Sequence, residues 1–209
     1  MGKPERIDEK VRAFDNPVLE RLSRVHPAIP ICTWGPVALG SIYLGIRAEM
    51  AVPRVIGFVI VGLFSWTLVE YMLHRWIFHW QSRNARLRAW FYPVHQLHHD
   101  VQEWDRIVAP PLMSLPLAVI LLGLFWLLIG PPMVFPFFGG FIIGYLAYDY
   151  THYATHFVSP RTWIGKGLRK RHLQHHFACP DRWYGVSSPL WDYVFRTHVP
   201  RGVSPSSLS

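Results

Sequence analysis

Residues 107–148 read IVAPPLMSLPLAVILLGLFWLLIGPPMVFPFFGGFIIGYLAY and contain no Asp, Glu, Lys or Arg. One helix needs about 20 apolar residues to cross the hydrocarbon core of a bilayer, and this run is roughly twice as long. Pro131 and Pro132 divide it, and proline starts a helix readily but cannot continue one. The run therefore predicts a transmembrane hairpin whose spans cover about 112–130 and 132–150.

A second pair of uncharged stretches precedes this run. The stretches 29–46 and 55–69 are separated by a short segment that holds Arg47, Glu49 and Arg54. We expect a second hairpin with spans over about 29–46 and 54–73, with two buried helices of a soluble core as the alternative. Of the 209 residues, 51% are hydrophobic and 15% aromatic, which is rich for a soluble domain. The expected fold class is an all-α integral membrane protein with four transmembrane helices in two hairpins.

The basic residues indicate how these spans are oriented. Nineteen of the 21 Lys and Arg residues precede the first span, lie between the hairpins or follow the last span, whereas Arg47 and Arg54 lie on the other side. By the positive-inside rule, both termini and the middle loop are cytoplasmic. The formal charge of +8 follows from this topology and from attraction to anionic headgroups, so no nucleic-acid partner is expected.

Three segments follow from this reading. Residues 1–28 are too charged for a signal peptide and form a cytoplasmic amphipathic segment, with a helix over 6–24 that is broken near Pro17 and lies on the membrane surface. Residues 29–199 form the membrane domain, with a cytoplasmic helical cap over 74–111 and 151–199, and residues 200–209 form a flexible tail. Cys32 and Cys179 imply no disulfide framework.

Ten of the 12 histidines fall into four groups, and every group lies on the cytoplasmic side. The groups are His74 and His79; His95, His98 and His99; His152 and His156; and His172, His175 and His176. His26 and His198 stand alone and are interpreted as solvated or capping residues. A single HxxxH pair often lies on a surface, but two HxxHH segments and two further pairs at one membrane face indicate a shared metal centre.

The spacing suggests how the ligands divide between two metal ions. On a helix, residues four apart share a face, whereas adjacent residues diverge by about 100°. We expect one ion to be bound by five imidazoles that include the diverging residues of both HxxHH segments, and the other ion by the two same-face pairs. The first set is His98, His152, His156, His175 and His79, and the second is His95, His99, His172, His176 and His74; the sequence hardly distinguishes the places of His79 and His74.

Two carboxylates lie one helical turn before a histidine. Glu70 precedes His74 and Asp149 precedes His152, so either could accept a ring N–H and orient that ligand. An ion pair between Glu70 and Arg75 is the alternative. Asp100, Asp105 and Asp192 are candidates only because they adjoin the motifs.

From about Leu68 to Thr197 the chain resembles the fatty acid hydroxylase superfamily of integral-membrane di-iron enzymes, to which the sterol desaturases are related. The resemblance rests on LVEYMLHRWIFH, HQLHHD followed by DRIVAPP, YDYTHYATHF, and KRHLQHHF followed by YGVSSPLWDYVF. These segments look most like the sphingolipid-type fatty acid 2-hydroxylases. The resemblance implies that the ten histidines bind two iron ions.

The chain also departs from that family pattern. Family members often carry a cytochrome b5 domain that supplies electrons, and the 28 residues before the first span are too few for one. We therefore expect a separate electron donor, such as a cytochrome b5 or a ferredoxin-type protein. The segment after His99 also differs from the family, which leaves the exact acyl substrate open.

The chemistry agrees with the ligand set. Hydroxylation of an unactivated C–H bond needs an oxidant that iron can generate from O2 and two electrons, whereas zinc has no redox chemistry, although it can replace iron in a purified sample. The expected reaction is 2-hydroxylation of a lipid acyl chain, free or sphingolipid-linked. A sterol or other polycyclic lipid is the alternative substrate, and a histidine-rich metal carrier or sensor is a further alternative.

The predicted topology and the aromatic residues near the motifs lead to two further expectations. We expect an integral membrane protein with a cytoplasmic active site, in the endoplasmic reticulum membrane of a eukaryote or the inner membrane of a bacterium. Aromatic side chains beside the motifs could line an acyl entrance or anchor the protein at the membrane interface. They are Trp76, Trp80, Trp90, Tyr92, Trp183, Tyr184 and Trp191.

Overall fold

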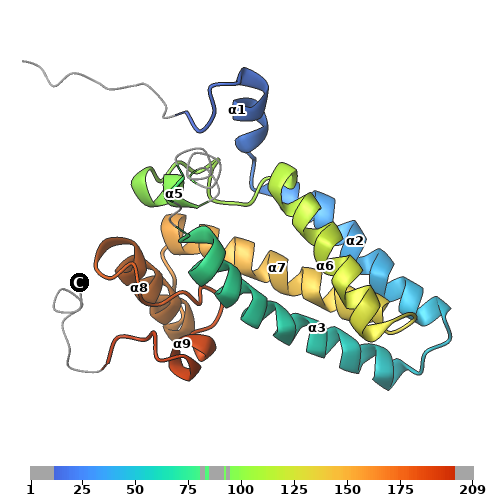
Figure 1. Cartoon of the computed structure of the whole chain (residues 1–209). Helices are drawn as coiled ribbons and strands as arrows, with labels where there is room; N and C mark the ends of the chain where they lie inside the picture. Colours follow the sequence, from blue (N-terminus) through green and yellow to red (C-terminus); the bar gives the residue numbers. More distant parts are fainter. Residues whose placement is uncertain (1–11, 81–82, 85–91, 93–94, 201–209) are drawn as a thin grey trace, which may run out of the picture.

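The computed structural model describes residues 12–80, 83–84, 92 and 95–200, and the regular elements within these ranges are all helical. Four long helices run side by side and form a bundle (Figure 1). They are α2 (Ala28–Arg47), α3 (Val52–Met72), α6 (Pro111–Ile129) and α7 (Val134–Phe157). A short π-helix, η1 (Leu73–Phe78), continues α3 without a break.

The shorter helices gather at one end of the bundle, where η1 follows α3 and where α7 ends (Figure 1). They are α1 (Pro17–Ser23), α5 (Gln96–Asp100), α8 (Trp163–Phe177) and α9 (Leu190–Val194). The sequence expectation of an all-helical chain is confirmed for the described residues. The histidine motifs lie on or beside the elements at this end.

The central helix is α7, and α2 and α3 pack against it. Its neighbours approach so closely that two glycines are required. A Cβ atom at Gly62 would lie 1.9 Å from the carbonyl oxygen of Phe137, and one at Gly140 would lie 2.0 Å from the carbonyl oxygen of Val59. Such close backbone packing between helices depends on small residues. It fixes α3 against α7 along the length of the bundle.

Three helical segments are long and apolar enough to cross a membrane: Ala28–Arg47, Val52–Phe78 and Pro111–Ile129. In α6, which supplies the last of these, no residue is buried, as expected for a helix that contacts lipid. The fourth expected span falls on α7, which is not among the three. Many α7 side chains are buried, so this helix is surrounded mainly by other parts of the protein.

The described part of the amino-terminal segment is shorter than the helix expected over 6–24. Helix α1 begins at Pro17, and the side chain of Asn16 caps it by accepting hydrogen bonds from the backbone of Val18 and Leu19. The predicted break near Pro17 is therefore the start of the helix, since proline suits the first helical position. Residues 1–11 and 201–209, which include most of the expected tail, lie outside the described residues.

Candidate metal centre

The ten histidines of the four motifs come together in two groups of five at this end of the bundle. The first group is His74, His79, His95, His99 and His175, and the second is His98, His152, His156, His172 and His176. Within each group, the ring nitrogens that could bind a metal lie within 4.8 Å of one another. Neither His26 nor His198 belongs to a group. The arrangement offers five imidazoles to each of two ions.

His74, in η1, and His79, which directly follows it, are brought together by the π-helix. His74 and His79 are five residues apart, a spacing that would place them on different faces of an α-helix. In a π-helix the hydrogen bonds run between residues five apart, and the backbone N–H of His79 donates to the carbonyl of His74 at 3.3 Å. The two rings then face the same centre, with their Nε2 atoms 3.2 Å apart.

The two HxxHH segments contribute in a crossed pattern. His95 and His99 join His175 in the first group, whereas His172 and His176 join His98 in the second. Each segment thus gives its same-face pair to one centre and its diverging histidine to the other.

The predicted division of the ligands was therefore wrong in part. It placed both diverging residues in one set and both same-face pairs in the other, because spacing along a helix says nothing about how two helices face each other. In the structure α5 and α8 meet so that the pair of one helix faces the diverging histidine of the other. The place of His79 also differs from the prediction, since it lies with His74.

Backbone carbonyl groups orient two of the rings. Nδ1 of His74 lies 2.5 Å from the carbonyl oxygen of Tyr184, and Nδ1 of His175 lies 2.7 Å from that of Arg182. A carbonyl can only accept, so the proton of each ring sits on Nδ1 and the Nε2 lone pair is directed toward the group. These are the contacts by which proteins fix the tautomer of a metal-binding histidine.

Burial keeps these imidazoles neutral. Desolvation, and then the neighbouring histidines, hold the pKa of His98 and of His172 well below the usual value. The pKa of His99 is lowered to about 3, and that of His79 to about 4, mainly by burial. At neutral pH the rings therefore carry lone pairs rather than charge, as a metal ligand must.

The donor set fits a pair of transition-metal ions. Among the described residues, both groups consist of imidazoles alone, and imidazole suits iron, zinc, copper and nickel. Both ring nitrogens of His176 are inaccessible to solvent and have no hydrogen-bond partner among the described residues. Unpaired buried nitrogens are costly, and a bound cation would satisfy the one nitrogen that this ring offers to its group.

Glu70 contacts the loop that orients His74 and not the ring of His74 itself. It accepts hydrogen bonds from the backbone N–H of Val186 at 2.7 Å and from the N–H and hydroxyl of Ser187. These residues belong to the loop whose Tyr184 carbonyl orients His74. The predicted contact with a ring N–H is thus made by a carbonyl of this loop, and Glu70 holds the loop. Arg75, the alternative ion-pair partner, donates to the hydroxyl of Tyr71.

Asp192 holds the same loop from its other side. It is fully buried and accepts hydrogen bonds from the backbone of Tyr184 and of Gly185, both at 2.9 Å, and from the hydroxyl of Thr197 at 2.7 Å. In the sequence, Asp192 was a candidate only because it lies near the motif. No local spacing links Asp192 to residues 184–185, so its role emerges only from the folded loop.

The other three acids also contact protein groups. The predicted contact of Asp149 with a ring N–H of His152 is not made, because this carboxylate accepts a hydrogen bond from the backbone of Ala109 at 3.0 Å instead. Asp100 accepts one from the hydroxyl of Tyr92 at 2.7 Å. Asp105 pairs with Arg24.

An apolar cavity of about 550 Å³ adjoins the histidines. Its metal end is lined by His95, His98 and His152, which come from both groups, and it continues along α7 between α3 with η1 on one side and α6 on the other. The volume and the apolar lining are those of a site for a small molecule or a lipid chain.

The aromatic residues expected at an acyl entrance are not those that line this cavity. Its aromatic lining comes largely from the bundle helices, including Trp34, Trp66 and Phe141. Trp76 and Trp80 are exposed, as membrane-interface anchors would be, and Trp90 lies outside the described residues. The sequence did not reveal the cavity, because its lining residues also have the pattern of ordinary core positions.

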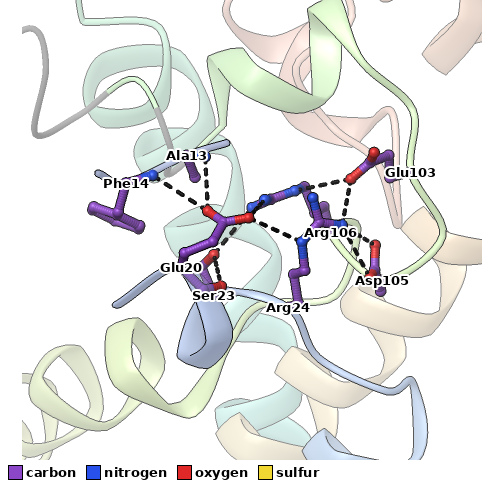
Figure 2. Close-up of polar contacts among 8 residues, drawn as sticks. All are labelled: Ala13, Phe14, Glu20, Ser23, Arg24, Glu103, Asp105 and Arg106. Carbon is purple, nitrogen blue, oxygen red and sulfur yellow. Dashed lines mark hydrogen bonds and ion pairs between the residues drawn. The ribbon is translucent and has the colours of Figure 1, made fainter. Parts of the chain in front are cut away.

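The segment around α1 covers the metal end of the cavity. Phe14 and Ser23 line it together with Arg106. Figure 2 shows the network that attaches this segment to the loop after α5. Arg106 pairs with Glu20 and with Glu103, and Arg24 pairs with Glu20, Glu103 and Asp105. The amino-terminal segment is thereby joined to the loop that follows His95, His98 and His99.

Comparison with known proteins agrees with this geometry. The sequence model of the family described as fatty acid hydroxylase matches residues 59–197. The dihydroceramide fatty acyl 2-hydroxylase FAH1 of Arabidopsis thaliana is 35% identical over 201 residues, which cover 93% of this chain and 83% of that protein. The fatty acid 2-hydroxylase of Homo sapiens is 33% identical over 225 residues, covering 93% of this chain and 58% of that protein.

A solved structure has the same fold. It is described as full-length scs7p with only the hydroxylase domain visible, and it superposes with a TM-score of 0.83 at 29% identity. The match covers 91% of this chain and 72% of that one. The similarity therefore extends over nearly all of the described helices.

Proposed function

Because this chain belongs to the fatty acid hydroxylase family, we propose that it hydroxylates the acyl chain of a membrane lipid at the carbon next to the carbonyl group. One observation carries this assignment: a single apolar cavity is lined at one end by histidines of both groups. An acyl chain bound there would present one of its ends to the metal centre. The relatives named as 2-hydroxylases favour the carbonyl end.

We assign the ten histidines as the ligands of two metal ions, five to each group. Iron is the metal that fits the reaction, because zinc has no redox chemistry, although zinc can occupy imidazole sites after purification. When bound, the two ions would supply the oxidising chemistry, with O2 and two electrons as co-reactants. We propose that a separate protein of the cytochrome b5 or ferredoxin type delivers the electrons.

The chain's own residues bind and orient the substrate. The apolar walls formed by α6 and α7 hold the acyl chain by burying its methylenes, which fixes the reacting carbon against the histidines. Glu70 and Asp192 hold the loop that orients His74. The segment around α1 covers the metal end, where it keeps water from the reacting carbon. Asp149 lines the cavity and holds the connection that leads into α6 by accepting the backbone N–H of Ala109.

The topology is part of the same proposal. The apolar spans of α2, α3 and α6 make this a membrane protein, and we propose α7 as the fourth crossing. Because Lys and Arg gather on one side of the predicted spans, we propose that both termini and the metal centre face the cytoplasm. The membrane is that of the endoplasmic reticulum in a eukaryote, or the inner membrane in a bacterium.

Expression in a host that lacks 2-hydroxylated lipids tests the function. New 2-hydroxy acyl chains, measured by mass spectrometry, should appear with the unchanged chain and with His198→Ala, because His198 lies outside both groups. They should be absent with His175→Ala. Products that persist in the absence of O2, or sterols that change while acyl chains do not, would contradict the proposal.

A further inference from the structure

One face of α6 forms a wall of the cavity and also closes its far end. Ser114, Leu117, Ala118 and Leu121 all line the cavity, and their spacing of three and four residues places them in one stripe. The next residue of this stripe is Phe125. Its ring lies 4.8 Å from that of Phe137 and 5.0 Å from that of Phe141.

The far end of the cavity is therefore closed by aromatic rings from three helices. Phe141 of α7 lines the cavity and lies between Phe125 of α6 and Trp66 of α3, whose ring centroid is 5.1 Å away. Rings packed in this way interdigitate and leave no passage for a chain. A bound acyl chain thus meets a barrier at this depth.

The depth of the barrier matches one leaflet of a bilayer. Phe141 precedes His152 by eleven residues of the same helix, which corresponds to about 16 Å at the rise of an α-helix. Half of the hydrocarbon core of a bilayer is about 15 Å. The cavity can therefore hold about as much extended chain as a lipid has within its own leaflet.

We infer that the aromatic far end of the cavity limits the length of the acyl chain that is hydroxylated, and that Ala118 and Phe125 of α6 are the residues that set this limit. The inference rests on the proposed function, because the reaction fixes the carbonyl end at the histidines. The position of the terminal methyl group then depends on chain length alone. A chain that is too long must displace the rings or leave its reacting carbon out of place.

The two residues should shift the limit in opposite directions. Ala118 is small and half-buried, so Ala118→Phe fills the cavity before its far end and should favour shorter chains. Phe125 is half-buried behind Phe141, so Phe125→Ala opens space beyond the present limit and should favour longer chains. A single methylene in an apolar pocket changes discrimination by about tenfold or more. The ratio of long to short products should change by at least that factor in each variant.

The test is the chain-length profile of the 2-hydroxy products from a host that supplies ceramides with acyl chains of graded length. Val119→Phe and Leu127→Ala are matched controls, because these neighbouring α6 side chains are 69% and 84% exposed. The controls should keep the profile of the unchanged protein. The inference is overturned if Ala118→Phe and Phe125→Ala also keep it, or if the controls shift it equally.

A binding measurement separates this inference from the function itself. Saturated fatty acids of graded length, added to the purified protein, stabilise the folded state by mass action. The thermal midpoint should rise with chain length up to a limit, and that limit should move to longer chains in Phe125→Ala. A limit that moves in a protein without hydroxylase products would sustain the inference and reject the proposed reaction. If 2-hydroxy products form but the limit in chain length does not move in Phe125→Ala, the proposed reaction stands and the inference is rejected.

Discussion

His98 and His175 are the two residues that test the crossed grouping most directly. Each belongs to a different group from the other two histidines of its own HxxHH segment. His175 lies with His95 in the first group and apart from His98, which is in the second. The double variant His95→Ala/His175→Ala should therefore damage one site and leave the other intact. The double variant His98→Ala/His175→Ala should weaken both.

A chelator titration with metal analysis distinguishes these outcomes. We expect His95→Ala/His175→Ala to retain about one ion per chain, which resists the chelator as well as in the unchanged protein. In His98→Ala/His175→Ala, we expect both ions to be removed more easily by the chelator. Loss of an outer partner of a ligand already lowers metal affinity by about 10- to 100-fold, and loss of a ligand itself should cost more. His26→Ala is the control. The reverse pattern would restore the division in which His98 and His175 share an ion.

At this scale the sequence predicted which histidines gather but not how they divide. The ten residues share one face of the membrane in the predicted topology, and spacing alone shows which of them share a helical face. Whether His98 meets His175 or His172 depends on how α5 and α8 approach each other, which no local pattern records. Glu70 illustrates the same limit, since its partner Val186 is 116 residues away.

At the scale of elements, the contact between α3 and α7 can be tested through glycine. Gly62→Ala and Gly140→Ala each place a methyl group within about 2 Å of a carbonyl oxygen on the facing helix, so the helices must separate. We expect a loss of about 1–3 kcal/mol for each, the usual cost of overpacking. The measurement is the thermal unfolding midpoint of the purified protein in detergent.

Gly57→Ala is the matched control, because nothing lies within 4 Å of a Cβ atom at this position of the same helix. Alanine favours a helix over glycine by about 0.5–1 kcal/mol, so this variant should melt at the same temperature as the unchanged protein or slightly above it. Equal midpoints for Gly57→Ala, Gly62→Ala and Gly140→Ala would show that the close packing of α3 on α7 is not needed.

The helices themselves were more predictable than their details. Uncharged stretches marked α2, α3 and α6, because crossing a bilayer constrains length and composition. The π-helix η1 was not predicted. The spacing of His74 and His79 is the signal that could have revealed it, since residues five apart share a face only in that helix type.

For the whole molecule, the metal centre joins parts of the chain that are otherwise separate. The ten histidines come from η1 and the residue that follows it, from α7, from α8 and from the segment that begins at His95. Ions that bind the folded state alone stabilise it by about 2.7 kcal/mol at a hundredfold excess over their dissociation constant. Removal of the ions should therefore destabilise the assembled end of the molecule, while the packing of α3 on α7 holds the bundle together.

Limited proteolysis with and without a chelator tests this expectation. We predict that chelation lowers the thermal midpoint and exposes the connections at 101–110 and 158–162 to cleavage, and that iron(II) or zinc reverses both effects because either ion satisfies the imidazoles. The segment 134–150 of α7 should stay protected throughout, since its contacts with α3 need no metal. If the protease cleaves α7 as readily as the two connections once the chelator is present, the bundle itself depends on the ions. If it changes neither midpoint nor cleavage, the ten histidines do not hold this end together through metal.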